Sequence, residues 1–119
     1  MNRPQELEDR LIDFAVRVIN VSEALPTSKA GNHVSGQLLR SGTSPAANYA
    51  EARGAESRKD FVHKMKISLK ELRESLVWLK IIERQPLCDA ILLKEIIKEC
   101  DELISIFVSS VKTADKNAT

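Results

Sequence analysis

The fold is decided by residues 37–82, which read QLLRSGTSPAANYAEARGAESRKDFVHKMKISLKELRESLVWLKII. The first half of this stretch carries four polar residues spaced four, four and three positions apart: Arg40, Ser44, Asn48 and Glu51. That spacing places the four side chains along one face of a single helix. A polar stripe in a mostly apolar helix needs a partner, so we expect a second helix or another subunit to cover it.

Apolar residues recur every three or four positions along most of the chain, a period that predicts α-helices. The expected helices span residues 4–25, 28–54, 58–84 and 89–112, followed by a polar tail at 113–119. Ser57 caps the third helix, and Gln85 with Pro86 ends it. The apolar residues expected to face inward include Ile19, Leu39 and Leu92.

Pro45 lies in the middle of the second predicted helix. Proline removes a backbone hydrogen bond and clashes with the carbonyl four residues earlier. The polar stripe keeps its phase on both sides of Pro45, so we expect a continuous helix with a kink near this residue.

Four helices of about 20 residues with short connections fold most simply as an antiparallel, up-down-up-down four-helix bundle. The chain has 119 residues, which is enough for one domain with its own core. Aromatic residues make up only 4% of the chain, and this favours interlocking aliphatic helices over a β-sandwich. We therefore predict an all-α protein with a single domain at residues 1–119.

Composition excludes several classes of partner and site. Lys and Arg number 18 against 17 Asp and Glu, so a nucleic acid or membrane partner would need a local patch of charge. The first residues are charged and no apolar run approaches about 18 residues, which predicts a cytoplasmic protein with no membrane partner. Cys88 and Cys100 lack the spacing of metal ligands, so we expect reduced thiols, no metal and no cofactor.

Helix register brings the polar stripe close to charges of the third helix. If the second and third helices turn near Ala55, residues whose numbers sum to about 111 lie side by side. Arg40 then faces Glu71, and Glu51 lies near Lys64. One interpretation is a structural polar network, buried or at an interface, that fixes the register. Its members are Arg40, Ser44, Asn48, Glu51, Glu71 and Glu74.

The other interpretation makes the charges of this network an active site. We favour the structural one, because no nucleophile, metal-ligand set or glycine-rich loop accompanies the charges. His33 and His63 also lack a serine or cysteine companion, so we do not expect an enzyme.

Basic residues step by four, three, four and three positions along the third helix. They form a basic ridge about 20 Å long on one helix face, a candidate site for nucleic acid. The ridge consists of Lys59, His63, Lys66, Lys70 and Arg73. A solvated lysine face has the same pattern, and no aromatic platform for bases accompanies this one.

The third and last helices carry more apolar residues than one bundle needs, which predicts self-association. The surplus consists of Val62, Ile67, Val77, Trp78, Ile81, Ile91, Ile106 and Val108.

The chain resembles a family of bacterial four-helix-bundle proteins related to proteins encoded by intervening sequences of large-subunit ribosomal RNA genes. The matching positions are Gln37 to Ser41, Ser44, Asn48, Glu51, Ala52, Ser57, Arg58, Asp60, Phe61, Lys64, Glu71, Glu74, Trp78 and Leu79. The resemblance implies a homopentamer arranged as a barrel. A related branch is the accessory protein of diversity-generating retroelements, which binds nucleic acid and a reverse transcriptase. Pro45 departs from the pattern, because many relatives carry an aliphatic residue there.

Two functions remain open at this point. The first is a non-catalytic oligomeric assembly or scaffold protein that binds RNA or DNA through the basic ridge. The second is a purely structural homo-oligomer that binds a protein partner and has no affinity for nucleic acid.

Overall fold

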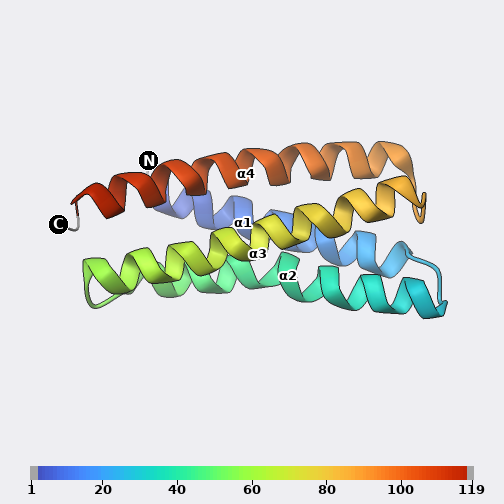
Figure 1. The fold of residues 1–119 in the computed structure, drawn as a ribbon, viewed down its shortest axis with the longest axis horizontal. Helices are drawn as coiled ribbons and strands as arrows, with labels where there is room; N and C mark the ends of the chain where they lie inside the picture. The colour runs from blue at the N-terminus through green and yellow to red at the C-terminus, as the bar shows by residue number, and fades with distance from the viewer. Residues whose placement is uncertain (1–2, 118–119) are drawn as a thin grey trace.

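The structure is a computed structural model that describes residues 3–117 and contains four α-helices joined by short loops (Figure 1). The helices are α1 (Arg3–Ala24), α2 (Lys29–Arg53), α3 (Arg58–Arg84) and α4 (Ala90–Asn117). The described residues include no β-strand, so the prediction of an all-α four-helix bundle is confirmed. None of these helices combines the length and the apolar character that crossing a bilayer requires.

Successive helices lie along one another in a bundle of 48 × 27 × 19 Å (Figure 1). Near the start of α1, Glu8 pairs with Arg53 at the end of α2, with 3.0 Å between Oε1 and the guanidinium nitrogen. Near the end of α1, the Ser22 hydroxyl donates to the Ser35 carbonyl near the start of α2, at 3.4 Å. These contacts show that α1 and α2 run in opposite directions.

Serine side chains begin two of the helices. The Ser28 hydroxyl accepts a hydrogen bond from the Gly31 backbone N–H at 3.0 Å, and this caps α2. Ser57 does the same for α3 through the Asp60 N–H, also at 3.0 Å, as the sequence predicts. Each bond satisfies a backbone donor that the first helical turn leaves without a partner.

The end of α4 corrects the predicted polar tail. The helix continues to Asn117, five residues beyond the expected end at Lys112. Ala114 is buried on the core side, and the Asp115 carboxylate lies 3.3 Å from the Lys66 ammonium of α3. These tertiary contacts stabilise a final turn whose local sequence is polar, while residues 118–119 lie outside the described range.

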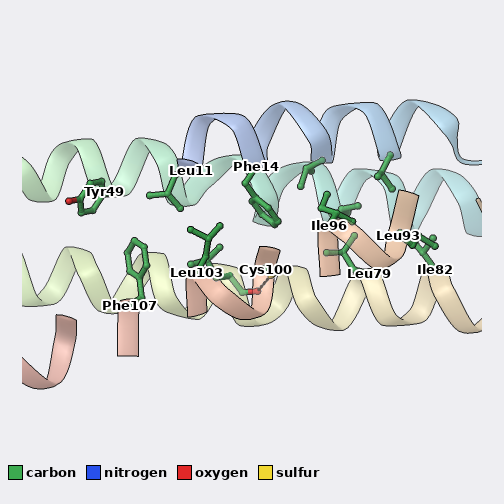
Figure 2. Close-up of a cluster of buried hydrophobic side chains, with 14 of the residues drawn as sticks. Leu11, Phe14, Tyr49, Leu79, Ile82, Leu93, Ile96, Cys100, Leu103 and Phe107 are labelled. Atoms are coloured by element: carbon green, nitrogen blue, oxygen red, sulfur yellow. Dashed lines mark hydrogen bonds between the residues drawn. The ribbon is translucent and has the colours of Figure 1, made fainter. Parts of the chain in front are cut away.

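The core lies between the inward faces of all four helices and is almost wholly aliphatic (Figure 2). The largest fully buried side chains include Leu11, Phe14, Leu38, Met65, Leu72, Leu79, Ile96, Leu103 and Phe107. Tyr49 meets Phe107 edge to face, with ring centroids 5.8 Å apart.

Three residues expected in the core are exposed instead: Ile19 by 41%, Leu39 by 40% and Leu92 by 40%. Each follows or precedes a buried neighbour, and adjacent helical residues point about 100° apart. In α1 the inward position is taken by Val21, which is fully buried.

Small residues line the contact between α2 and α3. Ser41, Ser68 and Ser75 are fully buried, and the Ser75 hydroxyl lies 3.0 Å from the Ser41 hydroxyl. The Ser68 hydroxyl donates to the Pro45 carbonyl at 3.4 Å. Helix α2 runs without interruption through Pro45, and a kink at this residue stays a prediction.

Helices α1 and α4 close the bundle along a seam, where they meet less extensively than any other neighbouring pair. The seam is held by Arg10, whose guanidinium lies 2.6 Å from Oε1 and 3.1 Å from Oε2 of Glu99. Glu102 adds a second carboxylate at 3.5 Å.

Candidate nucleic-acid interface

The five residues of the basic ridge all lie on the exposed outer face of α3. The opposite face of α3 is buried at Val62, Met65 and Leu72, which recur at the helical period. Packing of this inward face therefore turns the ridge toward solvent, as the sequence pattern predicts.

One ridge residue has an acidic partner from another helix. Lys66 pairs with Asp115 of α4, and this contact was not predicted because α4 was expected to end before Asp115. Within residues 3–117, the four other members have no ion pair: Lys59, His63, Lys70 and Arg73. Farther along α3 the same outer face becomes apolar, with Val77 exposed by 56% and Ile81 by 40%.

The structure brings Arg40 of α2 together with Glu71 and Glu74 of α3, the pairing expected from the helix register. One guanidinium nitrogen lies 3.0 Å from Oε2 of Glu71, and another contacts Oε2 of Glu74. The Trp78 indole N–H donates to the same Glu74 oxygen at 3.0 Å. His33 of α2 lies against the Trp78 ring, with centroids 5.8 Å apart.

Sequence reasoning missed the roles of Trp78 and His33 in this cluster. Trp78 follows Glu74 by four positions, so helical spacing could have indicated the contact. His33 gives no comparable signal, because its contact with Trp78 depends on how α2 packs against α3.

The Arg40 cluster is only partly shielded from solvent in the single chain. The Arg40 side chain is 51% exposed, and those of Glu71 and Glu74 are 19% and 33% exposed. The interpretation as a buried pair is therefore wrong for the single chain, and its placement at a subunit interface stays a prediction. Partly solvated pairs of this kind contribute about 1 kcal/mol or less to stability.

Of the three remaining members of the predicted network, one pairs with a lysine of α3 and two have no partner in the described part of the chain. Glu51 lies 3.1 Å from the Lys64 ammonium. Ser44 has a buried hydroxyl, and within residues 3–117 that hydroxyl has no hydrogen-bond partner. Asn48 likewise takes part in no side-chain hydrogen bond to the described part of the chain.

The two thiols do not supply a nucleophile at neutral pH. Cys100 is fully buried, and burial raises the pKa of its thiol to about 12, with a smaller contribution from the Asp101 carboxylate. Burial also raises the pKa of the half-buried Cys88 thiol. Among residues 3–117, no group of three or more His, Cys, Asp or Glu side chains could hold a metal ion.

The fold and the sequence both match a described family. A protein of unknown function from the S23 ribosomal protein family of Bacteroides thetaiotaomicron has a similar crystal structure, with a TM-score of 0.83. The two chains are 35% identical, over 89% of this chain and 98% of that chain. No curated protein matches the sequence. A sequence profile of the 23S rRNA-intervening sequence proteins matches residues 5–109, and the chain belongs to this family.

Proposed function

We propose that the protein is a non-catalytic assembly protein whose subunits bind RNA or DNA through the basic ridge of α3. The observation that carries this proposal is the set of exposed cations without an acidic partner in the described chain: Lys59, Lys70 and Arg73. Cations of this kind attract phosphates and release the counterions condensed on the nucleic acid, which favours binding at low salt. A row along one helix can follow a phosphate backbone without reading its sequence.

Association with further copies is part of the same proposal. Helix α1 exposes an apolar stripe, with Ile12 exposed by 45%, Val16 by 49% and Ile19 by 41%. The residues on the same side of α1 are acidic and exposed: Asp9, Asp13 and Glu23. We call this surface the acidic apolar face.

The outer face of α3 has the opposite charge around its own apolar residues. Val77 and Ile81 are exposed there. Their exposed neighbours are basic: Lys80 and Arg84. We call this surface the basic apolar face.

These two faces are complementary in charge and both present apolar side chains. Contact between different faces of identical subunits gives a ring when the rotation closes. A homopentamer is the ring size we propose, following the family resemblance.

A cytoplasmic location belongs to this proposal as well, because the two cysteines are free in the structure.

The nucleic-acid proposal is tested by the salt dependence of binding. The variant Lys66→Gln, Lys70→Gln, Arg73→Gln should bind RNA or DNA more weakly at every sequence. The slope of log affinity against log salt should fall by about 0.7 to 0.9 for each phosphate that the variant no longer neutralises. Lys66 loses its Asp115 pair in this variant, so its helix content and native mass are measured alongside binding.

A matched control removes three exposed lysines that lie outside the ridge: Lys29, Lys94 and Lys98. If the ridge variant binds as tightly as this control, the ridge is not the site. Comparison of two variants with equal loss of charge separates a local site from general electrostatic attraction.

A second candidate function is a structural homo-oligomer that binds a protein partner and has no affinity for nucleic acid. The pairing of Lys66 with Asp115 favours it, because this contact neutralises a cation in the middle of the ridge. Absence of binding by the wild-type protein at low salt would select this candidate.

A further inference from the structure

Two adjoining hollows lie where α1 and α3 begin and α2 and α4 end, at the end of the bundle that holds both termini (Figure 1). Their volumes are about 420 Å³ and about 360 Å³. Leu7, Tyr49 and Ser110 line both, so together they form one depression with a common floor. We name it the Tyr49 hollow.

A tyrosine hydroxyl faces this depression without a partner in the described part of the chain. Tyr49 is only 5% exposed, yet its hydroxyl takes part in no hydrogen bond to the described residues. Figure 2 shows the Tyr49 ring against Phe107, with its hydroxyl directed away from the labelled core residues. The hydroxyl is therefore available to donate to a molecule held in the depression.

The walls of the Tyr49 hollow are apolar on both sides of this hydroxyl. Leu7 and Ile106 line the first hollow, and Phe61 and Met65 line the second. Apolar walls with a few placed polar groups are typical of sites for small molecules. A ligand for this site therefore needs an apolar body.

Arginines at the rim determine the charge of that ligand. Arg3 borders the first hollow and Arg58 the second, and neither has an ion pair within residues 3–117. Arg10 also borders the first hollow but is held by Glu99, and Glu6 contributes one negative charge. The uncompensated charge at the rim is positive, which favours an anionic head group.

We propose that the Tyr49 hollow binds a small amphipathic organic anion, with its apolar body over Leu7 and its head group near Arg3 or Arg58. The Tyr49 hydroxyl donates a hydrogen bond to the bound molecule. Burial raises the pKa of Tyr49, so the hydroxyl keeps its proton at neutral pH and is able to donate. This site is independent of the ridge and does not depend on nucleic-acid binding.

The test uses anilinonaphthalene sulfonate, an anion with an apolar aromatic body, and measures its fluorescence and binding stoichiometry on the folded wild-type protein. One molecule should bind per chain. Tyr49→Phe keeps the ring and removes the hydroxyl, so its affinity should be about fivefold weaker. Ser110→Leu places a larger side chain between the two hollows and should abolish binding.

Uncharged phenylnaphthylamine separates the role of charge from that of apolar contact. The double variant Arg3→Gln, Arg58→Gln should weaken binding of the sulfonate and leave binding of the uncharged probe unchanged. Leu39→Ser is the control for exposed apolar side chains outside the hollow and should alter neither affinity. Thermal unfolding of every variant shows that the probes report on folded protein, because loosened states also bind such dyes.

The proposal is overturned if the sulfonate does not bind, or if it binds several molecules per chain. Equal affinity of the wild type, Tyr49→Phe and Ser110→Leu would place the probe elsewhere and overturn it too. Loss of binding in Leu39→Ser would assign the probe to the exposed apolar surface of α2 and overturn the proposal as well. If Ser110→Leu does not fold, Tyr49→Phe and the double arginine variant still decide between these outcomes.

Discussion

At the scale of single residues, two glycines of α2 have opposite surroundings. A Cβ atom on Gly42 would lie 2.6 Å from both methyl groups of Val18, which is fully buried in α1. A Cβ atom on Gly36 would meet nothing within 4 Å. Gly42 therefore permits the close approach of α1 and α2, whereas Gly36 only adds backbone freedom to the unfolded chain.

Substitution of each glycine by alanine should change stability in opposite directions. Gly36→Ala should raise the free energy of unfolding by about 0.4 to 1 kcal/mol through its effect on the unfolded chain. Gly42→Ala has the same effect on the unfolded chain, but its methyl group overpacks Val18 at a cost of about 1 to 3 kcal/mol. This variant should therefore be less stable than the wild type. Urea unfolding of the two variants measures both changes. Equal stabilisation by both would show that α1 and α2 can move apart freely.

Cys100 predicts how stability changes in alkaline solution. Its pKa is about 12 in the folded protein and near 9 in the unfolded chain. Between these values the unfolded chain loses the thiol proton and the folded chain keeps it, so stability falls as pH rises from about 9 to 12. Below pH 9 the thiol is protonated in both states, so Cys100 causes no loss of stability there.

Cys100→Ala should flatten that alkaline decline, although the variant is less stable overall because it leaves a cavity. The difference in slope should approach about 1.4 kcal/mol per pH unit. Urea unfolding of both proteins at several values between pH 9 and 11 measures it. Parallel declines would mean that Cys100 does not titrate differently in the two states.

At the scale of helices, the last turn of α4 depends on contacts with the rest of the bundle. Ending the chain at Lys112 removes the buried Ala114 and the pair between Asp115 and Lys66. We expect a loss of about 1 to 2 kcal/mol in the free energy of unfolding, measured by thermal or urea denaturation. Asp115→Asn removes only the exposed ion pair and should cost less than about 1 kcal/mol. A shortened protein that melts with the wild type would show that this turn is not needed.

The helices were largely predictable because their signals are local. Ser57 as a cap and the pairing of Arg40 with Glu71 follow from spacing along one or two helices. The end of α4 was not predictable, since it depends on Lys66 of another helix. The outward positions of Ile19 and Leu39 also depend on how the helices rotate against each other.

The candidate sites divide in the same way. The outer face of α3 was predictable. The apolar residues of this helix recur at the helical period and face the core, so the basic ridge between them must face outward. The Tyr49 hollow was not, because it needs Leu7, Tyr49 and Ser110 from three helices to meet at one end of the bundle.

At the scale of the whole molecule, the two apolar faces predict an assembly larger than the 13.3 kDa chain. Val16→Lys places a charge in the acidic apolar face, and Val77→Lys places one in the basic apolar face. Each should reduce the native mass measured by light scattering or native mass spectrometry, because it puts a charge into an apolar contact. Ala47→Lys, on the exposed side of α2, is the control and should leave the mass unchanged. A wild-type monomer at micromolar concentration would contradict the assembly.

The seam between α1 and α4 determines how the molecule opens. Every other extensive contact between the described helices joins neighbours in the chain, so those pairs form after closing only a short loop. The seam joins the first helix to the last. Forming it closes the longest loop and so costs the most conformational entropy, while its contact is the least extensive of the four helix pairs. Local opening should therefore begin between Arg10 and Glu99, while the α1–α2 and α3–α4 hairpins stay intact. Two chains opened in this way expose the same pair of inward faces, so α1 of each chain can pack against α4 of the other, and concentrated protein has a direct route to a domain-swapped dimer.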